Sequence, residues 1–245
     1  FHADHYLGII GFLRTLGMGG REEPLVLYGP MPAKKLLDEA IHLGVERLLF
    51  PVSIEELKGG DVVKRQGYEV TAVKVDHRIN ALGYVLQEDV RPGRFDLEMA
   101  KSLGVAPGPD FGRLQKGEEV KAADGSTVKP EQVLGPSRAG RRVVISGDTR
   151  PCQALVDASR DADLLVHEAT FSDDEQERAL DTRHSTAREA GQVAAAAKVG
   201  RLLLTHLSSR HDVDPRPLLE QARQAFDGKV DVAFDGLVVE VPVRE

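Results

Sequence analysis

Histidines and an aspartate gather at the start of the sequence, in the run Phe1-His2-Ala3-Asp4-His5. Imidazole and carboxylate groups are the ligands that zinc takes in proteins, and Mn²⁺ takes them where carboxylate and water contribute. His2 and His5 are three residues apart and would face the same side of a helical turn. The run therefore indicates a cluster that could serve one metal ion or two ions lying close together.

Four more residues of ligand type follow predicted strands. They are His77 after "TAVKVD", Asp148 after "VVISG", Glu168 after "DLLVH" and His206 after "LLLT". Functional groups in α/β proteins gather at the carboxyl ends of strands, where loops are free of ladder hydrogen bonds. Any one of these histidines alone would be read as structural. The whole set, together with the first cluster, is better explained as a metal site.

The elements that must position these residues have an α/β texture. An apolar run with a helical period follows His5 and predicts a helix ending near Gly17–Gly20. Alternating or continuous apolar runs predict strands at 24–30, 67–75, 81–87, 142–148, 163–171, 201–207 and within 230–242. Amphipathic or alanine-rich runs predict helices at 33–44, 152–162, 186–200 and 215–226.

The stretch 91–142 breaks this texture, because it is rich in Gly, Pro and charge. It contains one predicted helix, Phe95 to Leu103, and a hairpin around Asp124–Gly125. From Arg91 to Arg150 there are 11 Lys and Arg against 8 Asp and Glu, whereas the rest of the chain has 21 against 31. We expect a protruding insertion without a second core, and the plain alternative is a solvated surface excursion.

Composition sets outer limits on the protein class. The chain has 245 residues, 41% hydrophobic residues and a net charge of −7, which fits one large domain or two small ones and argues mildly against a nucleic-acid binder. No apolar run approaches the roughly 20 residues that span a bilayer. The single Cys152 excludes an intrachain disulfide, fits a cytoplasmic protein and is interpreted as a packing residue.

The motifs carry a resemblance to a known family. "FHADHYLGIIGFL" resembles the end of the His-x-His-x-Asp-His motif of the metallo-β-lactamase superfamily, and "SGDT" and "LTH" resemble its later ligand motifs. "HEATF", "RHST" and the insertion "GVAPGPDFGRLQKGE" are similar to the ribonuclease Z family. The family motif begins with a histidine two positions before His2. We therefore expect an N-terminally truncated chain that lacks this ligand and the first strands of the fold.

The resemblance implies a fold and a metal site. The fold would be a four-layer αββα sandwich, with residues 1–245 forming a single domain that carries the flexible arm 91–142. One zinc site would use the missing histidine, His2, His77 and Asp148. The other would use Asp4, His5, His206 and the same Asp148, with Mn²⁺ as the alternative metal. Such a pair activates a bridging water and neutralises phosphoryl charge.

The implied reaction is removal of the 3′ trailer from precursor tRNA, which leaves a tRNA 3′-hydroxyl. Asp4 would orient the water or take its proton, and His184 of "RHST" would protonate the leaving oxygen with Glu168 behind it. Ser185 and Thr186 would bind a neighbouring phosphate. By strand alternation His167 should face away from Glu168 as a structural residue. His42 and His211 are interpreted as surface residues.

The resemblance also implies partners. The arm would grip precursor tRNA by shape and backbone, and residues available for phosphate contacts are Arg113, Lys116, Lys121, Arg138, Arg141 and Arg142. The protein would be a cytoplasmic homodimer without membrane contact. Two alternatives stay open: another hydrolase of the superfamily, acting on small phosphodiesters, sulfate esters or thioesters, and a non-catalytic RNA-binding scaffold.

Overall fold

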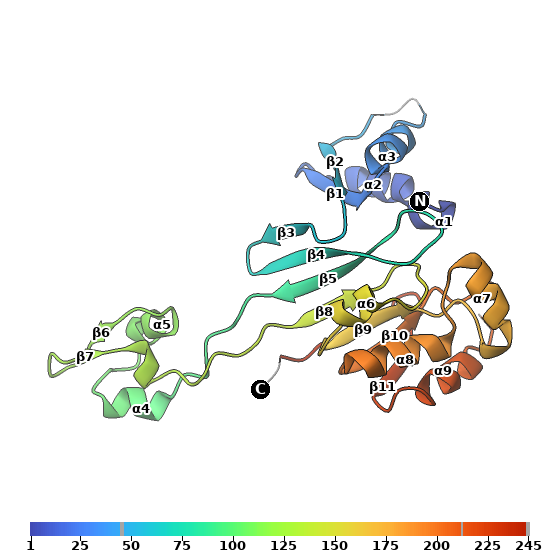
Figure 1. The fold of residues 1–245 in the computed structure, drawn as a ribbon. Coiled ribbons are helices and arrows are strands. Elements are labelled where there is room, and N and C mark those ends of the chain that lie inside the picture. The colour runs from blue at the N-terminus through green and yellow to red at the C-terminus, as the bar shows by residue number, and fades with distance from the viewer. Residues whose placement is uncertain (45–46, 212, 244–245) are drawn as a thin grey trace. The chain divides into compact units, whose positions relative to one another are not determined.

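The computed structural model describes residues 1–44, 47–211 and 213–243, which fall into two compact units (Figure 1). The larger unit is formed by Phe1–Leu86 and Arg142–Val241, and the smaller one by Gln87–Arg141 together with the C-terminal residues from Pro242 on. All of the predicted metal ligands belong to the larger unit.

A seven-stranded mixed sheet is the framework of the larger unit, with the strand order β11-β10-β9-β8-β5-β4-β3. The strands β8 to β11 run parallel to one another, and β3 is antiparallel to β4. Parallel neighbours place their carboxyl ends at one edge, which is the edge needed for the site. The strands are β3 (Val62–Arg65), β4 (Tyr68–Lys74), β5 (Leu82–Glu88), β8 (Arg142–Ile145), β9 (Leu164–Glu168), β10 (Arg201–Thr205) and β11 (Lys229–Val232).

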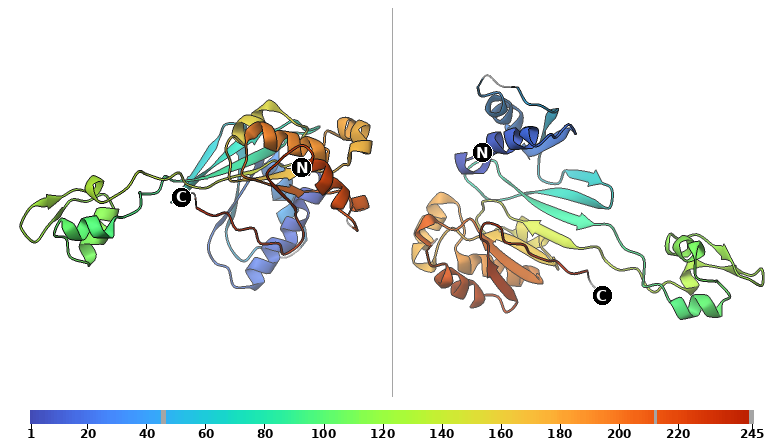
Figure 2. Two further views of the ribbon diagram at one scale, coloured as in Figure 1. Left: turned by 90° about the horizontal axis from the view of Figure 1, so that it is seen from below. Right: turned by 180° about the vertical axis from the view of Figure 1, so that it is seen from behind.

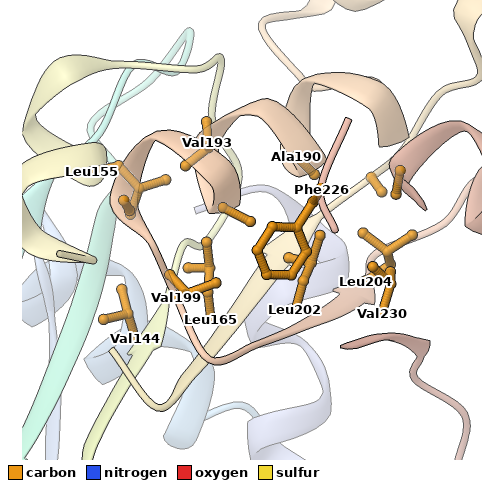
Figure 3. Close-up of a cluster of buried hydrophobic side chains, with 14 of the residues drawn as sticks. Val144, Leu155, Leu165, Ala190, Val193, Val199, Leu202, Leu204, Phe226 and Val230 are labelled. Carbon is orange, nitrogen blue, oxygen red and sulfur yellow. The ribbon is translucent and has the colours of Figure 1, made fainter. Parts of the chain in front are cut away.

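The helices α6 (Gln153–Ala158), α8 (Ala187–Ala197) and α9 (Arg216–Arg223) pack on this sheet, and α8 contacts both of the others. Figure 3 shows the resulting core, where Phe226 and Leu165 lie between the helices and the strands. The alanines of α8 allow close packing: a Cβ on Gly191 would lie 2.6 Å from the carbonyl oxygen of Ala222 in α9. The alanine-rich run at 186–200 is thus a core helix, as predicted.

A two-stranded parallel sheet lies on the other side of the seven-stranded sheet from α8 and α9 (Figure 2). Its strands β1 (Leu25–Pro30) and β2 (Val52–Leu57) are joined through α3 (Ala33–Ile41), which packs on both, and α2 (Gly8–Met18) packs against α3. The layer order is helix, sheet, sheet, helix, as predicted. The sequence analysis missed β2 and β3, because their charged residues obscure the alternation.

The smaller unit has a hydrophobic core of its own, so the expectation that this stretch lacks one is wrong. Its elements are α4 (Leu97–Ser102), α5 (Pro109–Gln115) and the hairpin of β6 (Val120–Lys121) with β7 (Thr127–Val128). The predicted helix and hairpin are therefore confirmed. The short elements hid the core, which consists of Ala100, Val105, Leu114, Val120, Ala122, Val128 and Val133.

Two further sequence expectations need correction or completion. The final run was expected to supply more than one strand, but after β11 the described residues 233–243 contain no strand. The sequence analysis did not predict α7 (Gln176–Thr182), which precedes the "RHST" motif. No helix within the described part of the chain combines the length and the apolar character needed to cross a membrane.

Candidate metal centre and proton donor

The first predicted ligand set comes together at the edge of the seven-stranded sheet. His2, His77 and Asp148 each offer a ligand atom, and these atoms lie within 4.8 Å of one another. The Nδ1 of His2 and the Nε2 of His77 are 3.3 Å apart, and Nε2 of His77 lies 3.9 Å from Oδ2 of Asp148. Two imidazole nitrogens and a carboxylate oxygen that face one another fit a divalent cation of the zinc type.

The second ligand set lies beside the first, and two of its members come from the helix α1 (Ala3–Tyr6). Asp4, His5 and His206 form another group of ligand atoms within 4.8 Å of one another. Asp148 belongs to the first set and also reaches the second, because its Oδ2 is 2.8 Å from Nε2 of His5 and its Oδ1 is 3.6 Å from Nε2 of His206. The structure thus brings all six predicted ligands into one centre, with Asp148 between the two sets.

The backbone turns sharply where the sheet delivers two of these ligands. Gly147 has φ +61, and a Cβ there would lie 2.8 Å from the carbonyl oxygen of Leu82, so glycine is required just before Asp148. His206 itself has φ 54, in the left-handed region that non-glycine residues rarely occupy. Such a conformation costs about 1–3 kcal/mol and is typical of functional sites.

Hydrogen bonds outside the ligand sets orient two of the imidazole rings. Nδ1 of His77 donates to the carbonyl oxygen of Arg183 at 2.9 Å, which leaves Nε2 for the centre. Nδ1 of His206 lies 2.8 Å from Oγ1 of Thr170, whose hydroxyl donates to Oε2 of Glu168 at 2.8 Å. Because that hydroxyl proton is used, the Thr170 oxygen accepts from His206. Contacts of this kind fix the tautomer of a metal-binding histidine.

Glu168 and His184 form a hydrogen-bonded pair next to the centre. Oε1 of Glu168 accepts from Nδ1 of His184 at 2.8 Å, and the His184 ring stacks on the ring of His206 at 5.3 Å. Burial lowers the pKa of His184, but the hydrogen bond and charge of Glu168, with the charges of Asp148 and Asp4, outweigh it and raise the pKa above 6.5. A carboxylate bonded to Nδ1 stabilises the protonated ring, which is the form that can donate a proton.

Glu168 is a fully buried carboxylate that holds several loops together. Besides His184 and the hydroxyl of Thr170, it accepts backbone N–H groups from Thr149 at 2.9 Å, Thr170 at 3.2 Å and Ser185 at 3.1 Å. Burial raises its pKa, but the bonds from His184, Thr149 and Ser185 prevail, so the pKa is lowered and the group stays charged.

Two predicted substrate contacts are not found. Ser185 and Thr186 are completely buried. The hydroxyl of Ser185 donates to the carbonyl oxygen of Thr149 at 2.6 Å, and Thr186 caps the N-terminus of α8 in a capping box with Glu189. Their side chains stabilise the loop that carries His184, so they do not present hydroxyls to a phosphate.

The remaining histidines mostly match expectation. His167 is fully buried with Nδ1 2.6 Å from the carbonyl oxygen of Glu168, which confirms a structural residue. His42 is an exposed surface residue. His211 is less exposed than expected and holds Glu175 at 3.0 Å. Sequence reasoning missed Thr170, although its place two residues after Glu168 in "HEATF" is the signal that could have found it.

The smaller unit is not basic, contrary to the expected charge balance. Residues 87–141 contain nine Lys and Arg and nine Asp and Glu. Arg113 pairs with Asp110 and Glu118, and Arg141 pairs with Glu88. Lys121 donates to the neutral hydroxyl of Thr127, Arg138 donates to the carbonyl oxygen of Pro92, and Lys116 is exposed. Arg142 belongs to the larger unit, where it bonds to the carbonyl oxygen of Ala158.

Comparisons with known proteins agree with the fold and the site. Residues 114–207 match the family model described as the beta-lactamase superfamily domain. The crystal structure of human tRNase Z, short form, has a TM-score of 0.65 at 22% identity and covers 99% of this chain and 77% of its own. The metallo-beta-lactamase fold protein YhfI from Bacillus subtilis has a TM-score of 0.63 at 21% identity, with 97% and 73% covered. Fold and site together define a protein of the metallo-β-lactamase fold with a candidate metal centre.

More similar relatives specify the family. The ribonuclease Z of Myxococcus xanthus is 70% identical over 245 residues, which cover all of this chain and 80% of that protein. The ribonuclease Z of Haloferax volcanii is 51% identical over 245 residues, which cover all of this chain and 77% of that protein. The chain therefore belongs to the ribonuclease Z family.

Proposed function

We propose that this protein removes the 3′ trailer from precursor tRNA by hydrolysing one phosphodiester, leaving a tRNA 3′-hydroxyl. The observation that carries the proposal is the Glu168–His184 pair beside the cluster of Asp and His ligands. A ribose alkoxide is a poor leaving group, so a proton donor near the metals is what RNA hydrolysis needs. The family relationship supports tRNA as the substrate.

His2, His77 and Asp148 would hold one zinc ion, and Asp4, His5, His206 and Asp148 would hold a second, with Mn²⁺ as the alternative. Two such ions supply an activated water and neutralise charge on the phosphoryl oxygens. Asp4, which is largely exposed and lies 3.3 Å from His206, orients the attacking water. His184 gives its proton to the departing 3′ oxygen, and the charge of Glu168 holds the ring in place.

The products test this chemistry directly. Precursor tRNA labelled at both ends should yield a tRNA with a 3′-hydroxyl and a trailer with a 5′-phosphate. A chelator should abolish the cleavage, and zinc or manganese should restore it. Asp148→Ala should not cleave, because it removes the carboxylate shared by both sets. A 2′,3′-cyclic phosphate on the tRNA would mean attack by the ribose hydroxyl and would overturn the assignment.

The smaller unit is proposed as the tRNA-binding arm, with its expected limits at 91–142. Lys116, Lys121 and Arg138 are the supporting residues, since Lys121 and Arg138 bond to uncharged oxygens and Lys116 is exposed. Lys116→Ala with Lys121→Ala should weaken tRNA binding and flatten its salt dependence by about one charge per lost phosphate contact. Arg113→Ala with Lys101→Ala is the matched control, because both cations are already paired with carboxylates.

Assembly and location complete the proposal. The protein is proposed to be a cytoplasmic homodimer, with the unpaired Cys152 supporting a reducing compartment. Sedimentation at several concentrations tests the dimer. Equal losses on precursor tRNA and on a small phosphodiester in the Lys116 and Lys121 variant would favour a hydrolase of small substrates. RNA binding without any hydrolysis by the metal-loaded protein would favour a scaffold.

A further inference from the structure

An ion pair next to the proton donor is used by none of the chemistry above. Arg150 follows the metal ligand Asp148 by two residues, and Glu189 lies in the first turn of α8. Their side chains are only 12% and 13% exposed, and both nitrogens of the Arg150 fork bond to the Glu189 carboxylate. A buried, bidentate pair is costly to form, and removing one partner leaves an uncompensated charge.

The pair is bonded to the loop that carries His184. Nη1 of Arg150 donates to the carbonyl oxygen of His184 at 2.7 Å and to Oε2 of Glu189 at 2.6 Å. Glu189 also accepts from the backbone N–H of Thr186 and from Nε2 of Gln176, both at 2.9 Å. Two residues of the "RHST" motif and Gln176 of the preceding helix α7 are thereby bonded to one guanidinium–carboxylate pair.

The same arginine joins this loop to the metal ligands through the backbone. Its N–H donates to the carbonyl oxygen of Asp76 at 2.8 Å, directly before the ligand His77. His184 is therefore held at three points: the ring by Glu168, the N–H by the carbonyl oxygen of Ala179 at 3.0 Å, and the carbonyl by Arg150. Ser185 also bonds to Thr149 and Glu168. The Arg150 bond is the one that holds the backbone carbonyl of His184 itself.

We propose that the Arg150–Glu189 pair is a positioning device that sets the His184 ring relative to the leaving oxygen. This proposal rests on the proposed function, in which His184 is the proton donor. Neither Arg150 nor Glu189 belongs to a ligand set, so the pair acts through the loop. Its loss should spare metal binding and impair only the step in which the proton is delivered.

Two substrates separate that step from the rest of the reaction. In precursor tRNA the leaving group is the 3′ alkoxide of the tRNA, which needs the proton of His184. A p-nitrophenyl phosphodiester releases a stable phenolate, which does not need it. Arg150→Met and Glu189→Gln should lower kcat on precursor tRNA by about 10- to 100-fold, with KM unchanged. Their rates on the p-nitrophenyl substrate and their metal content should equal those of the parent.

Matched variants guard against a merely structural explanation. Arg188→Met on the same helix removes a half-exposed pair with Asp173 and should leave both rates unchanged. Arg150→Lys keeps the charge but not the fork, so its rate on precursor tRNA should lie between those of Arg150→Met and the parent. Arg150→Lys also tests the proposal if Arg150→Met does not fold. The effects of Arg150→Met and Glu189→Gln should not add in the double variant.

The contrary outcomes are distinct. Equal loss on both substrates, or loss of metal, would show that Arg150 supports the metal centre and would overturn the proposal. An unchanged rate on precursor tRNA would overturn it as well. His184→Ala provides the reference: it must itself lose more on precursor tRNA than on the p-nitrophenyl substrate. If it does not, the proton-donor assignment fails, and the positioning role fails with it.

Discussion

Each compact unit contains a carboxylate that gathers donors from several chain segments, but the donors differ in charge. Glu168 of the larger unit is bound by backbone N–H groups, a hydroxyl and the His184 ring. Glu88 of the smaller unit is bound by the guanidinium groups of Arg91 and Arg141. The backbone N–H and hydroxyl donors are neutral, so they stabilise the Glu168 charge without cancelling it and leave it for the His184 ring. Glu168 therefore remains able to stabilise a protonated imidazole, whereas Glu88 is neutralised and structural.

The largest effect on kcat is expected from a change of Glu168, which binds the proton donor His184. Glu168→Gln should lower kcat on precursor tRNA by about 10²- to 10⁴-fold, because an amide cannot stabilise protonated His184 and would point N–H groups at the N–H of Thr149 or Ser185. Metal content should persist, since Glu168 is outside the ligand sets. Single-turnover cleavage and metal analysis check this. An unchanged kcat would show that Glu168, like Glu88, has only a structural role.

A smaller effect is expected from the hydroxyl that joins Glu168 to a metal ligand. Thr170→Val removes the acceptor that fixes Nδ1 of His206 and should weaken zinc binding by about 10- to 100-fold. Chelator competition measures this. Thr182→Val is the control, because that hydroxyl bonds to the carbonyl oxygen of Arg178 on an exposed helix. Equal zinc affinity in the two variants would contradict a role for Thr170 in orienting His206.

We expect Glu88 to stabilise the local structure of the smaller unit only. The Arg141 side chain, ahead of the other contributions, holds the pKa of Glu88 at about 2 instead of 4.5. Because the folded pKa is the lower one, the stabilisation is complete above pH 4.5 and is lost as the pH falls towards 2. Glu88→Gln should reduce hydrogen-exchange protection of the Arg91 and Arg138 amides at pH 7.

The control for the Glu88 variant is the catalytic activity of the larger unit. Hydrolysis of the p-nitrophenyl substrate by Glu88→Gln should equal that of the parent protein, since the metal ligands belong to the larger unit. A loss of this activity would show that the two carboxylates are not separate in function. Protection that stays the same at Arg91 and Arg138 would show that the Glu88 pair does not hold the segment.

The smallest effect is expected for a charged pair at the surface of the larger unit. Arg183 bonds to Asp76 at 2.9 Å, but the two side chains are 52% and 42% exposed. Arg183→Met should therefore change the free energy of unfolding by about 0–1 kcal/mol, as denaturant titration would show. A larger loss would mean that exposed pairs contribute as much as the buried Arg150–Glu189 pair.

The sequence predicted those parts of the site that follow directly from strand ends. Asp148, Glu168 and His206 lie at the ends of the parallel neighbours β8, β9 and β10, which must bring such residues to one edge. His77 follows the apolar run of β4. Ser185 and Thr186 were misread because a hydroxyl in a motif looks the same whether it faces substrate or caps a helix. Arg150 was overlooked because its partner Glu189 is 39 residues away, and only the folded chain shows the pair.

The smaller unit shows what the sequence patterns could not reveal. Its net charge was overestimated because Arg142, Asp148 and Arg150 of the larger unit were counted with it, whereas Glu88 and Asp89 of the smaller unit were left out. Its core went unnoticed because strands of two residues carry no readable alternation. Local turn chemistry, such as the hairpin at Gly125 with φ +85, was readable because it depends on neighbouring residues only.

The chain enters and leaves the smaller unit along segments bonded to each other. The N–H of Glu88 donates to the carbonyl oxygen of Arg141, and Arg91 and Arg138 exchange N–H···O bonds of 2.8 and 2.9 Å. A break in the chain at this ladder would leave two ends about as close as neighbouring strands, roughly 5 Å apart. A short turn could then join them, so evolution could shorten, enlarge or exchange the segment beyond without moving the strand ends that carry the ligands.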